Sequence, residues 1–98
     1  MEDKVLCKTP SPNKKPTRIA RWKYDAVRRC ILKSIDESDA GLLFKELPDR
    51  VANHLSADER ARLGSIAWYT TTVKLDMEVA GEIQRSPGKG PQKLTRKD

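Results

Sequence analysis

Apolar residues recur at three- and four-residue spacing in two segments of the chain, and each segment predicts an amphipathic helix. The first helix is expected over about residues 23 to 35, and its stripe consists of Tyr24, Val27, Ile31 and Ile35. The second stripe consists of Phe44, Leu47, Val51 and Leu55. The second helix should begin near Lys45, so that Pro48 falls in the first turn, where a missing amide proton costs little.

A new helical turn is predicted to start at Ser56, because Ser56 and Glu59 have the spacing of a capping box. Residues 57 to 63 either form a short helix of their own or merge with the following segment. The pair Gly64 and Ser65 leaves both alternatives open.

The segment 66 to 80 contains aromatic and β-branched residues that favour a strand. Helical spacing nevertheless continues up to Gly81, which suits the position after a helix C-terminus. The β-branched residues cost a helix about 1 to 2 kcal/mol, and burial of two or three large side chains can outweigh that cost. We therefore predict a helix.

Two short alternating runs follow Gly81, with Ile83 and Leu94 as their inward-facing members. Residues 86 to 91 contain two prolines and two glycines, which indicates the tip of a hairpin. A very short strand is also expected at residues 41 to 43. The predicted fold is mainly α with a small β-hairpin, an α+β class.

Residues 1 to 22 are predicted to be a basic, proline-containing arm, and residues 23 to 98 the folded domain. Two interpretations of the end of the arm stay open: Ile19 and Trp22 dock on the domain, or they lie along a phosphate backbone. Cys7 is expected to carry an exposed reduced thiol, and Cys30 to be buried on the first helix.

Positive charge is concentrated at both ends of the chain, whose formal net charge is +6. Residues 1 to 23 carry seven Lys and Arg against two acids, residues 24 to 81 eight against ten, and residues 82 to 98 five against two. A near-neutral body between basic segments is typical of a protein that binds polyanions, although solubility alone is an alternative explanation.

Catalytic and membrane functions have little support in the sequence. His54 is the sole histidine, and a solvated or capping role suits it better than that of a general base. The residues show no metal-ligand spacing, and we expect no cofactor, metal or small-molecule ligand. No apolar run is long enough to span a bilayer, so we expect a cytoplasmic protein and no membrane partner.

The order helix, short strand, helix, turn, helix, glycine and hairpin resembles a winged helix-turn-helix. Residues 75 to 85 are similar to the end of the recognition helix and the first wing strand of many bacterial regulators. A longer pattern resembles a small family of uncharacterised bacterial proteins, and it includes residues 15 to 18, 22 to 24, 44 to 48 and 68 to 76. The resemblance implies a three- or four-helix domain with a two- or three-stranded antiparallel wing, which contacts duplex DNA.

The resemblance also implies which residues face the DNA. On the 66 to 80 helix these are Trp68, Thr71, Thr72 and Lys74, and on the wing Arg85, Lys89, Lys93 and Arg96. Arm contacts are expected from Lys14, Lys15, Arg18 and Arg21. The helix lacks Arg, Asn and Gln, the usual bidentate readers of bases, so phosphate contact is the main expectation.

The alternative function is a non-catalytic protein interaction or dimerisation module on the same scaffold. A symmetric homodimer could form if Val5, Leu6 and Cys7 added a strand to the sheet of a neighbouring copy. RNA binding is a weaker option, since no exposed aromatic platform is evident.

Overall fold

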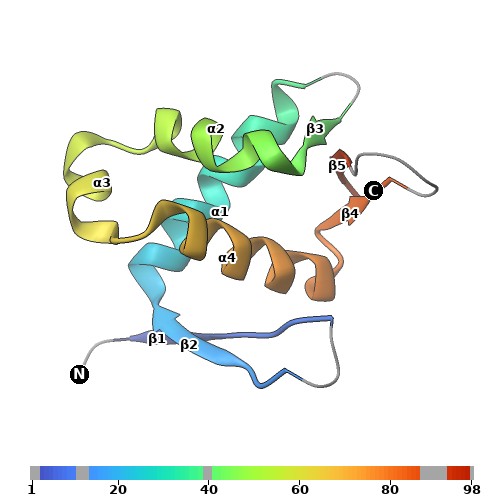
Figure 1. Ribbon diagram of the computed structural model, residues 1–98. Coiled ribbons are helices and arrows are strands. Elements are labelled where there is room, and N and C mark those ends of the chain that lie inside the picture. The colour runs from blue at the N-terminus through green and yellow to red at the C-terminus, as the bar shows by residue number, and fades with distance from the viewer. Residues whose placement is uncertain (1–2, 11–13, 39–40, 87–92, 98) are drawn as a thin grey trace.

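A computed structural model describes residues 3–10, 14–38, 41–86 and 93–97 (Figure 1). The described chain folds as four α-helices with two small antiparallel sheets, which confirms the predicted α+β class. In chain order the elements are β1 (Lys4–Cys7), β2 (Thr17–Ala20), α1 (Arg21–Asp36), β3 (Leu42–Leu43), the 3-10 turn η1 (Phe44–Glu46), α2 (Leu47–His54), α3 (Ala57–Leu63), α4 (Ile66–Ala80), β4 (Ile83–Arg85) and β5 (Lys93–Arg96).

The helix α1 is the centre of the domain and packs against both α2 and α4. Its predicted stripe is buried at Val27, Ile31 and Ile35, and Cys30 is fully buried beside them, as expected. These side chains join Leu47 and Val51 of α2 and Val73 and Met77 of α4 in one hydrophobic core.

The chain between α1 and α4 follows the predicted local signals. Pro48 lies in the first turn of α2, and Ser56 forms the capping box with Glu59 at the start of α3. Gly64 then adopts φ +97° and ψ −135°, an extended conformation with positive φ that favours glycine and ends α3 before α4 begins. The open question is thereby answered: α3 is a separate short helix.

The segment 66 to 80 is helical as predicted, and the following hairpin forms with β3 a sheet of order β3-β5-β4. Gly81 ends α4 in the left-handed conformation. Ile83 of β4 and Leu94 of β5 are buried, which confirms the predicted inward positions. The expected tip beyond Ser86, at residues 87 to 91, lies outside the described residues.

The N-terminal segment differs from the predicted arm, because β1 and β2 form an antiparallel hairpin that packs against α1 and α4. The helix α1 also begins two residues earlier than the predicted domain boundary, at Arg21. We refer to residues 3–10 and 14–20 as the N-terminal hairpin. Its inward positions are Val5, Cys7 and Ile19, where alternation places apolar side chains on the body of the domain.

The expected exposure of Cys7 is wrong, since only 3% of its surface is accessible. Docking of Ile19 is confirmed, because its side chain is buried, and Trp22 is half-buried.

Of the described helices, none has the length and apolar character needed to cross a membrane.

Candidate nucleic-acid interface

The helix α4 presents one face to the core and another to solvent. Ser65 caps its N-terminus by accepting a hydrogen bond from the amide of Trp68 at 3.2 Å. Thr70, Val73 and Met77 face the core, whereas Trp68 and Thr71 are exposed and Thr72 is half-buried. Three of the four helix residues predicted to face DNA therefore reach the surface.

Lys74 is the exception, because it is buried, and its predicted position on the outward face of the helix is wrong. The residue is 3% exposed; its Nζ lies 3.4 Å from Oε1 of Glu78 and 4.2 Å from the ring centroid of Phe44. Burial lowers the pKa of Lys74, and the Glu78 carboxylate opposes that effect. The side chain is directed into the domain because its helical position lies on the same face as Thr70 and Met77.

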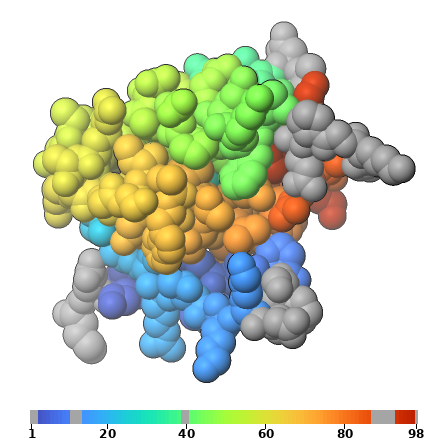
Figure 2. Space-filling model, in the orientation of Figure 1, coloured from blue at the N-terminus to red at the C-terminus, as the bar shows by residue number. Residues whose placement is uncertain are grey.

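The N-terminal hairpin lies beside the exposed face of α4 and is bonded to it through Asp76. The Asp76 carboxylate accepts from the amide of Lys8 at 2.9 Å and from the hydroxyl of Tyr24 at 2.6 Å. In the space-filling view, α4 crosses the visible face between α2 and α3 on one side and the hairpin on the other (Figure 2). Two segments far apart in the sequence thus form a single surface.

A groove of about 250 Å³ separates the hairpin from α4. Its lining combines three lysines with one aromatic and several hydroxyl side chains: Cys7, Lys8, Thr9, Lys14, Lys15, Thr17, Trp68, Thr71, Thr72 and Leu75. Among the described residues, none lies within ion-pair distance of the three lysines. The structure therefore brings the predicted arm contacts Lys14 and Lys15 together with the predicted helix contacts.

The sequence interpretation missed Lys8, whose place depends on the fold of the hairpin. The signal for this hairpin is two short apolar runs, Val5 to Cys7 and Ile19 to Ala20, and it is weak because each strand has only four residues. Arg18 is exposed on β2 but does not line the groove. Arg21 forms an ion pair with Asp3 and does not line the groove either.

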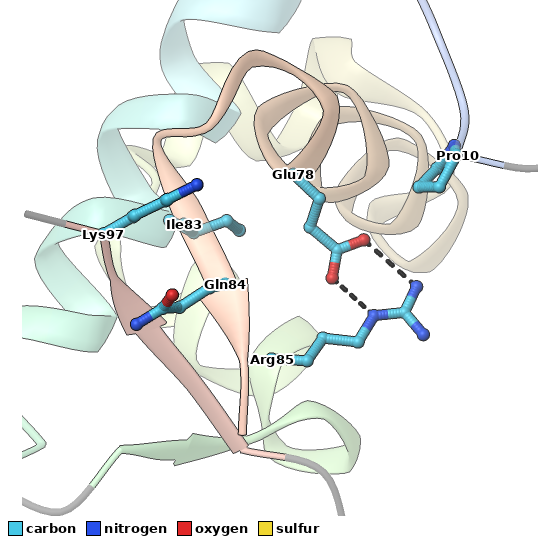
Figure 3. A pocket seen from close by; sticks show the side chains of 6 residues that line it. All are labelled: Pro10, Glu78, Ile83, Gln84, Arg85 and Lys97. Carbon is cyan, nitrogen blue, oxygen red and sulfur yellow. Dashed lines mark hydrogen bonds and ion pairs between the residues drawn. The ribbon is translucent and has the colours of Figure 1, made fainter. Parts of the chain in front are cut away.

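The arginines of the wing sheet are already paired with carboxylates. Arg85 donates two hydrogen bonds to Glu78, at 2.6 and 3.1 Å, across a shallow hollow beside β4 (Figure 3). Arg96 donates two to Asp36, at 2.6 and 2.7 Å. These bonds raise the pKa of both guanidinium groups. Lys93 is exposed, while Lys89 lies outside the described residues.

The ring of Trp68 is held in place by a neighbouring aromatic side chain. Its centroid lies 4.8 Å from that of Tyr69, in an edge-to-face arrangement with planes at 85°. The Tyr69 hydroxyl in turn accepts from Nζ of Lys23 at 3.2 Å, and Lys23 also donates to the carbonyl of Leu63 at 3.1 Å. Trp68 is nevertheless 46% exposed, so an exposed aromatic ring, packed on one edge against Tyr69, lines the groove.

The fold and this groove define a small, mainly helical α+β domain with a basic surface beside its last helix. The chain belongs to a family of unknown function, DUF6958, whose model matches residues 4–94. That match includes the N-terminal hairpin as well as the helices, so the groove lies within the family domain. No curated protein and no solved structure matches the chain.

Proposed function

We propose that the protein is a non-catalytic winged-helix protein that binds duplex DNA through α4, the groove lysines and the wing. The observation that carries the proposal is the groove itself, where Lys8, Lys14 and Lys15 line the same surface as Trp68 and Thr71. The strands β4 and β5, which follow α4 in the chain and form with β3 a sheet of order β3-β5-β4, support the winged-helix assignment.

The chemistry of this surface suits phosphate contact. Each lysine that pairs with a phosphate releases condensed counterions, which provides affinity without dependence on base sequence. The hydroxyls of Thr71 and Thr72 can bond phosphate oxygens or base edges, but α4 carries no bidentate base reader. We therefore infer binding with little sequence preference.

The contribution of the wing is smaller than its arginine content implies. Arg85 and Arg96 must leave Glu78 and Asp36 before they pair with phosphate, whereas Lys93 is exposed without an ion pair in the described chain. We assign the wing contact to Lys93, and the contact expected of Lys89, outside the described residues, stays a prediction. The two cysteines are both free and buried, which supports placing the protein in the reducing cytoplasm.

The decisive experiment is a fluorescence anisotropy titration of a random duplex at several salt concentrations. The native chain is compared with the variant Lys8→Gln, Lys14→Gln, Lys15→Gln, and with the control variant Lys33→Gln, Lys45→Gln, Arg60→Gln. The control removes the same charge from exposed residues on α1, η1 and α3. The slope of log K against log salt is negative, and we expect the groove variant to reduce its magnitude by about 2 to 3 and the control to change it by less than about 1.

The proposal is wrong if the native chain binds duplex no tighter than an unrelated protein of equal charge, or if both variants reduce the magnitude of the salt slope equally.

The alternative, a docking or dimerisation module, is favoured by the exposed apolar side chains Leu6, Trp68 and Val79. Such a module would show concentration-dependent self-association or partner recovery that is insensitive to nuclease treatment.

A further inference from the structure

Contact between the groove lysines and the phosphates of a double helix gives no specific role to the exposed aromatic ring of Trp68. Trp68 is 46% exposed, although an aromatic ring of this size gains most when it is buried. Its edge-to-face contact with Tyr69 restricts the ring, because Tyr69 is itself bonded to Lys23. A ring that is already oriented loses little conformational freedom when a ligand stacks on it.

The surroundings of Trp68 indicate what kind of ligand would stack there. Lys8, Lys14 and Lys15 line the same groove, so the ligand should carry negative charge close to a flat, apolar group. Thr71 and Thr72 supply hydroxyls that can bond its polar edge. A nucleobase with its flanking phosphates has this combination of a π face, polar edges and charge.

The dimensions of the groove favour a single base over a base pair within a duplex. The groove has a volume of about 250 Å³ and lies between the hairpin and α4. The major groove of DNA is about 12 Å wide and admits one helix, whereas here the hairpin lies alongside α4 at Asp76. A base that has left the stack can enter this space without requiring α4 to insert fully into the major groove.

We propose that Trp68 stacks on an unpaired nucleobase, while the three groove lysines pair with the phosphates that flank it. The protein would then prefer duplex DNA that contains an unpaired base over a fully paired duplex. This inference rests on the proposed function and makes it specific, since the protein would recognise a local DNA structure rather than a sequence. Stacking on an aromatic side chain corresponds to an affinity gain of about 5-fold to 150-fold for one base.

The test compares two duplexes with the same base-paired sequence, one fully paired and one that contains a single additional bulged adenine. Both are titrated with native protein, Trp68→Ala and Trp68→Phe, and with Trp22→Phe as the matched control. Trp22 is a suitable control because it is half-buried and its ring contacts the Arg62 guanidinium at 5.0 Å, outside the groove. Circular dichroism confirms that each variant is folded.

We expect the native chain and Trp22→Phe to bind the bulged duplex at least fivefold more tightly, and Trp68→Ala to bind both duplexes equally. Trp68→Phe should keep part of the preference, because its smaller ring can still stack. In the Trp22→Phe protein, Trp68 is the sole tryptophan, and its fluorescence should be quenched more by the bulged duplex than by the paired one.

The outcomes separate this inference from the proposed function. Tight binding of both duplexes without preference, or a preference that survives in Trp68→Ala, overturns the stacking of an unpaired base and leaves DNA binding in place. Failure to bind either duplex overturns both proposals. Self-association that depends on Trp68 would show instead that the ring is a protein contact, and it too would overturn the inference.

Discussion

Cys7 illustrates how the fold changes the chemistry of a single residue. Burial, together with the smaller effect of the nearby Asp76 carboxylate, raises the pKa of its thiol from 9.0 to about 11. The thiolate is the reactive form, so this shift alone lowers the reactive fraction near pH 8 by about 100-fold. A residue that would be reactive in an exposed arm is therefore protected in the N-terminal hairpin.

We predict that Cys7 is alkylated at least about 100-fold more slowly in the native protein than in the denatured protein at pH 8. The variant Cys30→Ala, which leaves Cys7 as the sole thiol, is treated with iodoacetamide and analysed by mass spectrometry. The native rate should rise about tenfold per pH unit up to about pH 11. Equal rates in the native and denatured proteins would contradict burial of the hairpin.

The same shift predicts how the thiol affects stability. The unfolded thiol releases its proton near pH 9, whereas the folded thiol keeps it until about pH 11. The unfolded state therefore binds fewer protons within this window, and the contribution of Cys7 to stability, present below pH 9, is lost as the pH rises to about 11. Urea unfolding of the native chain and of Cys7→Ala on both sides of the window measures this contribution.

At the scale of elements, two glycines determine how the wing sheet is joined to the helices. Gly81 has φ +80° and ends α4, and an added Cβ would meet no atom within 4 Å. Gly41 has φ +92° and precedes β3, but its added Cβ would lie 3.2 Å from Cβ of Lys93 and from Cγ2 of Thr95. Both positions carry the backbone cost of a left-handed conformation, and Gly41 carries a steric cost as well.

We predict that Gly81→Ala lowers the free energy of unfolding by about 1 kcal/mol and that Gly41→Ala lowers it by about 1 kcal/mol more. Urea denaturation followed by circular dichroism measures both losses. Gly81→Ala is the control for backbone strain, since only Gly41 faces β5 closely. Equal losses would show that β5 moves away from the added methyl group at no cost.

The helices were predictable because each carries its own signals. The stripe of α1, the capping box of α3 and the glycine after α4 are all local features, and each of these helices forms where its signal lies. The hairpin β1 and β2 was not predicted, because its pairing joins residues on either side of a proline-containing segment and few apolar side chains in its described strands are buried. Short strands depend on such non-local contacts more than helices do.

The candidate groove could be predicted only in parts. Lysine-rich and threonine-rich segments were both recognised, but sequence does not show on which side of α4 the N-terminal hairpin packs. The threonines at positions 70, 71 and 72 have the same chemistry, yet only Thr70 is fully buried, because each step along a helix turns the side chain by about 100°. The same geometry directs Lys74 inward. Its burial was not predicted, because a charged side chain is normally expected at the surface.

For the whole molecule, Asp76 connects the core, α4 and the N-terminal hairpin. Its two carboxylate oxygens accept from Tyr24 of α1 and from the Lys8 amide of the hairpin. The position of the groove lysines relative to Trp68 therefore depends on a residue that does not line the groove. Hydrogen bonds to a charged acceptor contribute about 1.5 to 3 kcal/mol, which is enough to determine whether a small hairpin stays docked.

We predict that Asp76→Ala accelerates amide hydrogen exchange in β1 and β2 by at least tenfold, with little change in α1 and α2, and weakens duplex binding about 2- to 10-fold. The affinity falls because ordering the undocked lysines then opposes binding. Asp36→Ala is the control, since it releases Arg96 of the wing sheet and leaves the hairpin bonded to Asp76. Faster exchange throughout the domain in Asp76→Ala would show that Asp76 supports the core as a whole, and the hairpin would then not be a separately docked unit.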